Sequence, residues 1–344
     1  MNPLVYALNA GDGNTAGSLL ELDASTGTVV GEVATGRYPT GMTFGRYGAA
    51  LYVIHTGSRT IARHRPQTLV VEDQKPITTP GTYNPSNPLH LAAGRDELLY
   101  FTDGARAPMV TVLDFAQGQV VGSYNDGEGV GGLAIRREVN DLYVWRQYGW
   151  GAGNVNSYVT HLDIRGTTPV ARESSLASWR RDPFDTPILF DAAERWVFNK
   201  QQMFDTRDLS LVVNQFRENL YAVSLDGSVA FGSTRVFNTQ TAREITNLVV
   251  ESSVQVLSTD QKRLFRWAPG SGLVVHDMAS IASVAGPDSV PVPADEPCWG
   301  RSLCSCRGRR PPRRSSMTST MRTARSPWHR LGPTRLRTGS GPMV

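Results

Sequence analysis

A ten-residue segment occurs twice in this chain without a gap. Residues 22–31 read LDASTGTVVG and residues 113–122 read LDFAQGQVVG, and the copies share Leu, Asp, Gly, two Val and the final Gly. Each copy places an apolar residue and Asp before a short turn closed by Gly, and a β-branched run follows, which is the pattern of a β-hairpin. The copies begin 91 residues apart. We therefore expect a repeated unit of about 45 residues.

Weaker copies of the unit extend over most of the chain. The apolar-plus-Asp marker recurs, with substitutions, at positions 23, 65, 114, 163, 205, 238 and 277. The aromatic or apolar strands that alternate with these markers are LVYAL, LYVIH, LLYFT, DLYVW, RWVFN, SVAFG and RLFRW. Between them lie short segments that suit a crowded innermost strand, namely TGMTF, PLHLA, GGLAI, PILFD, LYAVS and VQVLS.

Seven units of four short β-segments predict an all-β fold, a seven-bladed β-propeller of four-stranded blades. A β-sandwich has the same strand spacing and is the alternative, but the ten-residue repeat argues against it. The first unit begins at its second strand, so closure of the ring needs an inner strand from the C-terminal part. Only Ser289–Val292 is available, and its prolines suit a central strand poorly. The ring is therefore expected to be unclosed where the chain ends meet.

The segment TGRYPTGMTFGRYGAALYVIHTGSRTIARHRPQTLVV contains G-x-x-P-x-G, then Leu-Tyr-Val, then a strand and a turn. In these features it resembles the YVTN-type β-propeller repeat (WD40/YVTN-like), and the resemblance is good over residues 1–145. It departs from that repeat at Ile54-His55 and at Arg65. The resemblance implies a prokaryotic propeller, often exported, whose relatives mostly bind or scaffold. Some related propellers catalyse, among them lactonases and quinone-dependent dehydrogenases.

The charge divides the chain in two. Residues 299–344 hold 11 Arg and no acid, which leaves 24 basic and 31 acidic residues in the rest. We expect a propeller over 1–297, whose acidic body does not bind nucleic acid, and a basic Arg/Ser/Pro-rich tail over 298–344. Three interpretations of the tail stay open: a basic arm for nucleic acid or anionic lipid, a disordered tail without function, or a shifted reading frame. The frame shift would also explain the missing closing strand.

Composition also indicates which cofactors and which cellular location to expect. No apolar run is long enough to span a membrane. All three cysteines lie at or beyond residue 298, so the body has no zinc spacing, and neither a metal site nor a cofactor is expected. The N-terminus lacks a secretion signal, which predicts a cytoplasmic protein as the sequence is written. A periplasmic or exported protein is the expectation if the true start is missing.

Long connections concentrate binding residues on one face of a propeller. The long segments 9–17, 74–88, 146–157 and 174–186 all join second to third strands or outer to next inner strands, which places them on one face. Two of them are predicted neighbours and combine aromatic rings with guanidinium groups, which suits a protein or a small anionic or sugar ligand. The candidate ligand-binding residues are Trp145, Arg146, Tyr148, Trp150, Trp179, Arg180, Arg181 and Asp182. The alternative is that these side chains only cap the sheet edges and pair with one another.

His90 is the candidate catalytic residue, because the repeat alignment places it on an innermost strand near the channel entrance. No second His or carboxylate joins it by sequence. The sequence thus predicts a non-catalytic binding or interaction module that uses the long-loop face. The alternative is a lactonase-like or other hydrolase with its site at the mouth of the central channel.

Overall fold

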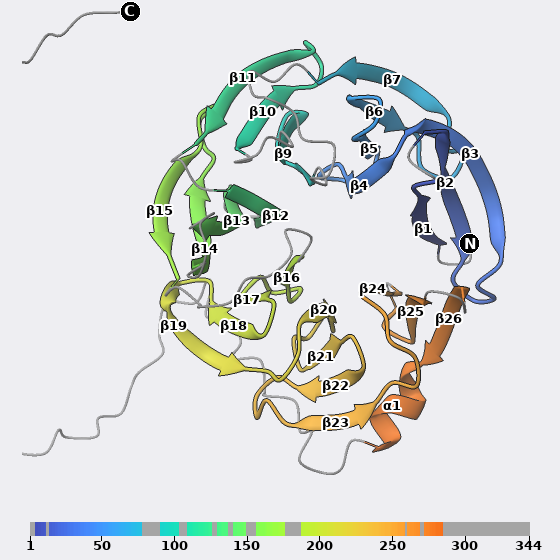
Figure 1. Cartoon of the computed structure of the whole chain (residues 1–344), viewed down its shortest axis with the longest axis vertical. Helices are drawn as coiled ribbons and strands as arrows, with labels where there is room; N and C mark the ends of the chain where they lie inside the picture. Colours follow the sequence, from blue (N-terminus) through green and yellow to red (C-terminus); the bar gives the residue numbers. More distant parts are fainter. Residues whose placement is uncertain are drawn as a thin grey trace, which may run out of the picture. The chain divides into compact units, whose positions relative to one another are not determined.

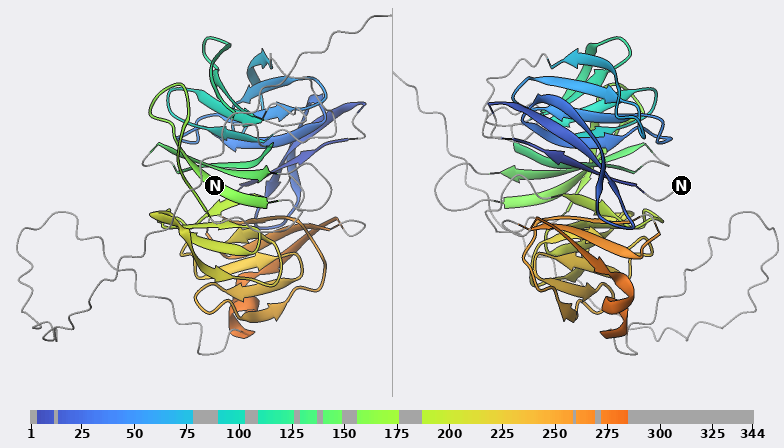
Figure 2. Two further views of the ribbon diagram at one scale, coloured as in Figure 1. Left: turned by 60° about the vertical axis from the view of Figure 1, so that its left-hand side comes forward. Right: turned by 90° about the vertical axis from the view of Figure 1, so that its right-hand side faces the viewer.

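The computed structural model describes residues 4–11, 14–77, 90–102, 109–125, 129–136, 140–148, 156–175, 187–258, 260–268 and 272–284. Seven antiparallel sheets stand in a ring around a central axis, each with its first strand innermost and its last outermost (Figure 1). Figure 2 shows the ring turned toward its side. The predicted seven-bladed all-β propeller is therefore confirmed. The tail over 298–344 and the proposed closing strand at 289–292 lie outside the described residues.

We number the blades in chain order. Blade 1 holds β1 (Leu4–Asn9), β2 (Ala16–Asp23) and β3 (Val29–Arg37), and blade 2 holds β4 (Pro39–Phe44), β5 (Leu51–His55), β6 (Thr60–His64) and β7 (Val71–Pro76). Blade 3 holds β8 (Leu91–Ala93), β9 (Leu98–Thr102), β10 (Val110–Asp114) and β11 (Gln119–Tyr124). Blade 4 holds β12 (Gly129–Arg136), β13 (Asp141–Tyr148), β14 (Asn156–Asp163) and β15 (Val170–Ser174).

Blade 5 holds β16 (Ile188–Phe190), β17 (Trp196–Asn199), β18 (Gln202–Asp205) and β19 (Asp208–Gln215). Blade 6 holds β20 (Leu220–Val223), β21 (Val229–Gly232), β22 (Arg235–Asn238) and β23 (Glu244–Asn247). Blade 7 holds β24 (Val254–Leu257), β25 (Arg263–Ala268) and β26 (Gly272–Asp277), and the helix α1 (Met278–Val284) follows. Within the described residues, no helix is long and apolar enough to cross a membrane.

The repeated Asp closes the turn between the third and fourth strands of a blade. The Asp23 carboxylate accepts hydrogen bonds from the backbone N–H groups of Ser25 and Thr26, at 2.6 and 3.1 Å, as expected of an Asx turn. Four residues after the Asp, Gly27 and Gly118 have φ of 73° and 69°, in the left-handed region that glycine adopts without strain. The sequence repeat is thus a repeat of turn geometry.

The core consists of wedges of side chains between neighbouring blades. In one wedge, Tyr52 and Ile54 of blade 2 pack against Leu99 and Phe101 of blade 3. Equivalent clusters join the other neighbours, and Phe265 of blade 7 packs with side chains of blade 1. Each blade buries both faces only because it has a neighbour on each side, as repeat architectures do.

The seam between blades 7 and 1 is built differently from the other junctions. Phe265 packs on Val5 and Leu22, and the Arg263 Nη1 donates a hydrogen bond to the Ala24 carbonyl oxygen at 2.5 Å. The sheets on both sides have only three strands among the described residues, because blade 1 lacks its inner strand and α1 follows the third strand of blade 7. In the described part of the chain, side-chain packing therefore brings the first and last blades together.

This seam predicts uneven hydrogen exchange. All five residues of β5 are buried, whereas its counterpart β1 has one buried residue in six and pairs only with β2 among the described strands. We expect alternate amides of β1 to exchange about 100-fold faster than those of β5, because unpaired edge amides open at low free-energy cost. Hydrogen–deuterium exchange with NMR or mass spectrometry measures this. Equal protection of the two strands would mean that β1 is paired on both edges.

Candidate functional site

The ring has two faces that differ in their connections. The long-loop face carries the connections from second to third strands and from each outer strand to the next inner strand. The turn face carries the connections from first to second and from third to fourth strands. Strand order in the seven sheets places the described ends of the strands that flank these long segments on the long-loop face. Whether they bind a ligand stays a prediction.

The structure corrects the placement of the first aromatic segment. Arg146 and Tyr148, predicted in the connection over 146–157, lie with Trp145 within β13, which pairs with β14 over eight residues up to Tyr148. The Trp145 side chain is 0% exposed and packs with Ile188 and Val197 of blade 5, because a large apolar ring fills the wedge between the blades. The other predicted residues, Trp150, Trp179, Arg180, Arg181 and Asp182, lie outside the described residues.

Arg146 is 5% exposed and belongs to a layer of cations and rings. Its guanidinium group lies over the rings of Tyr124 and Tyr158, 5.5 and 5.0 Å from their centroids, and its Nη1 donates to the Tyr124 hydroxyl at 3.1 Å. Beside it, the Lys200 Nζ is 3.8 Å from the centroid of the Trp145 ring. Such contacts hold cations in desolvated positions. This cation–aromatic layer lies where β11, β13, β14 and β17 reach the long-loop face.

His90 lies immediately before β8, the inner strand of blade 3. The backbone fixes it there, because Thr102 Oγ1 accepts from the His90 N–H at 2.9 Å and the Thr102 N–H donates to the His90 carbonyl at 3.1 Å. Its catalytic role stays a prediction. Among the described side chains, no group of three or more His, Cys, Asp or Glu could hold a metal ion.

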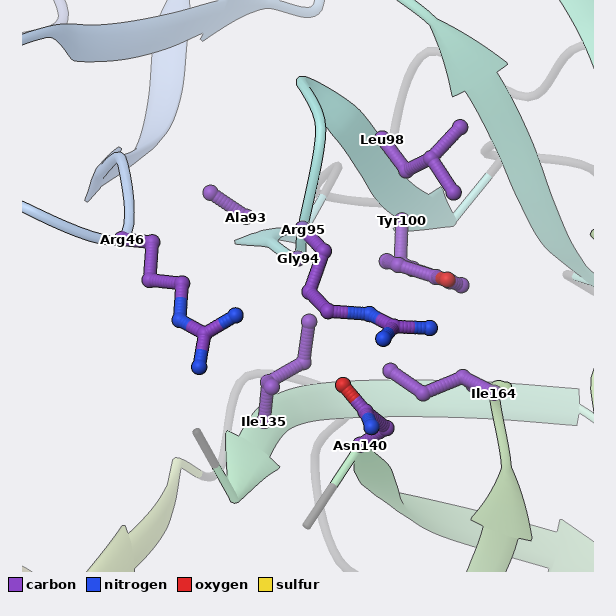
Figure 3. Close-up of a pocket in the computed structure, with 9 residues that line it drawn as sticks. All are labelled: Arg46, Ala93, Gly94, Arg95, Leu98, Tyr100, Ile135, Asn140 and Ile164. Atoms are coloured by element: carbon purple, nitrogen blue, oxygen red, sulfur yellow. The ribbon is translucent and has the colours of Figure 1, made fainter. Parts of the chain in front are cut away.

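A pocket that the sequence reasoning missed opens on the turn face. It is formed by the first-to-second-strand turns of blades 2, 3 and 4, which contribute Arg46, Arg95 and Asn140 (Figure 3). Its apolar wall consists of Ala93, Leu98, Tyr100, Ile135 and Ile164. The space including the open mouth is about 330 Å³, and its enclosed part, about 10 Å³, has room for about one water-sized group.

The turn that carries Arg95 is tightly fixed. The Leu98 N–H donates to the Arg95 carbonyl at 2.8 Å, and the two central residues, Asp96 and Glu97, have φ of 52° and 59°, which corresponds to a type I′ turn. The strained Glu97 is held by an ion pair of its carboxylate with Arg63 Nη1 at 2.8 Å. At Gly94 a Cβ would lie 2.7 Å from the Tyr100 ring, so glycine lets that ring form the pocket wall.

A second, larger cavity on the turn face lies between blades 4 and 5. This groove of about 630 Å³ is lined by Asp141, His161, Asp163, Arg165, Arg172, Glu173, Thr206 and Arg207. Most of its charges are already paired. His161 Nε2 lies 2.9 Å from an Asp141 oxygen. The Arg165 side chain and backbone N–H, and then Arg172, hold the pKa of Asp163 far below its usual range. The groove is therefore nearly neutral.

One sequence signal could have found the smaller pocket. Gly45-Arg46 and Gly94-Arg95 occupy the same position in two successive repeats, between the inner and the second strand. Because successive blades are neighbours in the ring, equal positions in successive repeats lie side by side. A repeated Gly-Arg pair therefore predicts two adjacent guanidinium groups on one face.

The comparisons with known proteins show the fold alone. No family model and no curated protein sequence matches the chain. A propeller solved in the Mitotic Checkpoint Complex is similar at a TM-score of 0.59 and 12% identity, covering 80% of this chain and 86% of that one. The β-propeller domain of Cps50 (Swd1) from Myceliophteria thermophila is similar at a TM-score of 0.57 and 11% identity, covering 80% of this chain and 95% of that one. A "putative 6-phosphogluconolactonase" from Bacteroides uniformis is similar at a TM-score of 0.57 and 13% identity, covering 80% of this chain and 92% of that one. The YVTN assignment stays a prediction.

Proposed function

We propose that this propeller is a non-catalytic binding module that takes a protein partner, or a small anionic or sugar ligand, on its long-loop face. The cation–aromatic layer of Tyr124, Trp145, Arg146, Tyr158 and Lys200 supports this proposal most directly. Arg146 and Tyr158 lie near the strand ends that flank residues 149–155, which carry Trp150. Trp145 packs with Ile188 of β16, the strand after residues 176–186, which carry Arg180. When the strand ends beside a connection are held rigidly, the residues of that connection lose less conformational entropy on binding a ligand.

The neighbouring structures are compatible with more than one class of function. The Mitotic Checkpoint Complex is an assembly of proteins by its name, and this favours a protein partner for our chain. A lactonase-like hydrolase with His90 at the channel mouth is the second candidate, and the propeller described as a "putative 6-phosphogluconolactonase" favours it. The two candidates differ in whether a bound ligand is turned over.

The double variant Trp150→Ala/Arg180→Ala tests the binding module. We expect it to lose whichever binding the parent shows, either retention of partner proteins or saturable binding of the anionic probe 6-phosphogluconate, because a ring and a guanidinium group would be removed together. The midpoint of thermal unfolding should stay within about 1 °C, since surface substitutions change stability by less than about 0.5 kcal/mol. Fluorescence titration, pull-down with mass spectrometry and a thermal melt measure these quantities.

The matched control is Tyr47→Ala/Arg243→Ala, which removes an aromatic ring and a guanidinium group from the turn face of blades 2 and 6. Tyr47 is 86% exposed and Arg243 is exposed, so this variant should bind as the parent does. Equal loss in both double variants would contradict a specific site. Hydrolysis of glucono-δ-lactone above background, abolished by His90→Ala, would favour the enzyme instead.

A further inference from the structure

We propose that the turn-face pocket of Arg46, Arg95 and Asn140 binds a carboxylate group. This site lies on the face opposite to the long loops and does not depend on the function proposed above. The ligand class follows from the charge, the size and the walls of the pocket.

The pocket carries two positive charges that no acid in its lining offsets. Elsewhere in blades 2 and 4 several guanidinium groups pair with carboxylates: Arg63 with Glu72 and Glu97, Arg65 with Glu72, and Arg165 and Arg172 with Asp163. Among the described residues, neither Arg46 nor Arg95 makes an ion pair or a side-chain hydrogen bond; Arg46 only lies over the Tyr47 ring, 5.5 Å from its centroid. The pocket is therefore an unneutralised cationic site.

The acids nearest in sequence do not neutralise it. Asp141 follows Asn140, but its carboxylate lies 2.9 Å from His161 Nε2. Glu97 follows Arg95 by two residues, but its carboxylate is bound to Arg63 at 2.8 Å. Asp96 is exposed and does not line the pocket. The Tyr100 hydroxyl adds no negative charge, because burial raises the pKa of Tyr100 to about 12. The positive charges of the two guanidinium groups are therefore left to be balanced by solvent ions or by a bound anion.

The donors suit a carboxylate in particular. A guanidinium group presents a planar fork of N–H donors that matches the two oxygens of a carboxylate. The Asn140 amide can donate a further N–H, and its backbone is held at φ 59° while its carbonyl accepts from the Ile164 N–H at 3.0 Å. Figure 3 shows Arg95 and Asn140 on one side of Ile135, near Tyr100 and Ile164, and Arg46 on the other side of Ile135.

The size of the pocket limits the ligand. The enclosed part has room for about one water-sized group, so it admits one carboxylate oxygen, while the rest of the ligand would lie in the open mouth. The apolar wall of Tyr100, Ile135 and Ile164 keeps water from one side, which strengthens charge-assisted hydrogen bonds. The carboxylate can come from a small organic acid or from an acidic side chain of a protein. The chemistry is shared, and the experiment separates the two sources.

The experiment uses the full chain and two probes, succinate and the blocked peptide acetyl-Gly-Glu-Gly-Glu-Gly-amide. Arginine Nε–Hε signals are followed by ¹⁵N NMR, and Arg46→Gln and Arg95→Gln assign the two pocket signals. We expect saturable shifts of both signals with at least one probe, and about tenfold weaker binding in either Gln variant. Arg95→Lys keeps the charge but loses the fork, so its affinity should lie between those of the parent and Arg95→Gln.

Arg243→Gln is the matched control, because it removes an exposed Arg from the turn face of blade 6 with the same change of charge. It should bind both probes as the parent does. Shifts with succinate alone indicate a small acid, and shifts with the peptide alone indicate a protein side chain. The proposal is overturned if neither probe shifts the two signals, if sodium chloride at equal ionic strength shifts them as far, or if Arg243→Gln weakens binding equally.

Discussion

Replacing Gly122 with alanine is expected to lower the free energy of unfolding by about 3 kcal/mol. Gly122 lies in β11, the outer strand of blade 3, where the backbone of the next blade comes close. A Cβ at this position would lie 2.8 Å from the carbonyl carbon of Thr167, nearer still to its oxygen, and 3.3 Å from the Cα of Thr168. Because these are backbone atoms, no side-chain rotation relieves the clash, and blades 3 and 4 must move apart.

Gly166→Ala is the control for this prediction. Gly166 lies in the same turn as Thr167, but a Cβ there would meet nothing within 4 Å. Its stability should therefore stay within about 0.5 kcal/mol of the parent. Urea unfolding of the two variants, followed by tryptophan fluorescence, gives the shift in midpoint. Equal midpoints would mean that the junction of blades 3 and 4 is loose enough to accept a methyl group.

Stability is expected to fall by up to about 3 kcal/mol through His55 alone as the pH is lowered from 6.5 to 4. His55 ends β5, is 1% exposed, and has its Nδ1 3.1 Å from the Thr60 hydroxyl. Its ring lies against Gly36, where a Cβ would be 2.7 Å from the ring. Burial first, and the nearby charge of His64 second, lower the pKa of His55 to about 4.

The direction of this effect follows from proton uptake. In the unfolded chain a histidine takes up a proton below about pH 6.5, whereas folded His55 does so only near pH 4. Between these values the unfolded state binds more protons, so acid favours unfolding. His276 adds to the same trend, because burial and then Arg266 lower its pKa.

Urea unfolding at pH 7, 5.5 and 4 measures the slope, which should be flatter in His55→Gln. The NMR signal of the His55 ring provides a second measurement, since it should not titrate above about pH 5 in the folded parent. A slope that His55→Gln leaves unchanged, together with a ring that titrates near 6.5, would contradict the burial of this side chain.

The blade order could be predicted from the sequence because each blade repeats local rules. An Asp before a tight turn, a Gly four residues later and an aromatic second strand are all visible within about 30 residues of sequence. Even the degenerate copy at Arg65 follows the rule. Leu69 takes the position of Gly27 and Gly118, with φ 57°, and its side chain is buried against Leu19 and Leu51. Burial of the leucine offsets the strain of the left-handed backbone.

The sites could not be predicted as well, because they depend on neighbours distant in the chain. Whether Trp145 faces solvent or a wedge is decided by how far the β13–β14 ladder extends and by side chains of blade 5. The pocket combines Arg46, Arg95 and Asn140, which no single repeat contains. Only the arrangement of three blades in the ring brings these turns together.

The Asx turns also affect the order in which this chain can acquire structure during synthesis. The turn at Asp23 is closed by bonds that reach no further than Thr28, so the hairpin of β2 and β3 can form as soon as it leaves the ribosome. The contact between Arg263 and Ala24 spans 239 residues and must wait until blade 7 has been made. Blade 1 is therefore the first blade synthesised and the last to gain both of its neighbours.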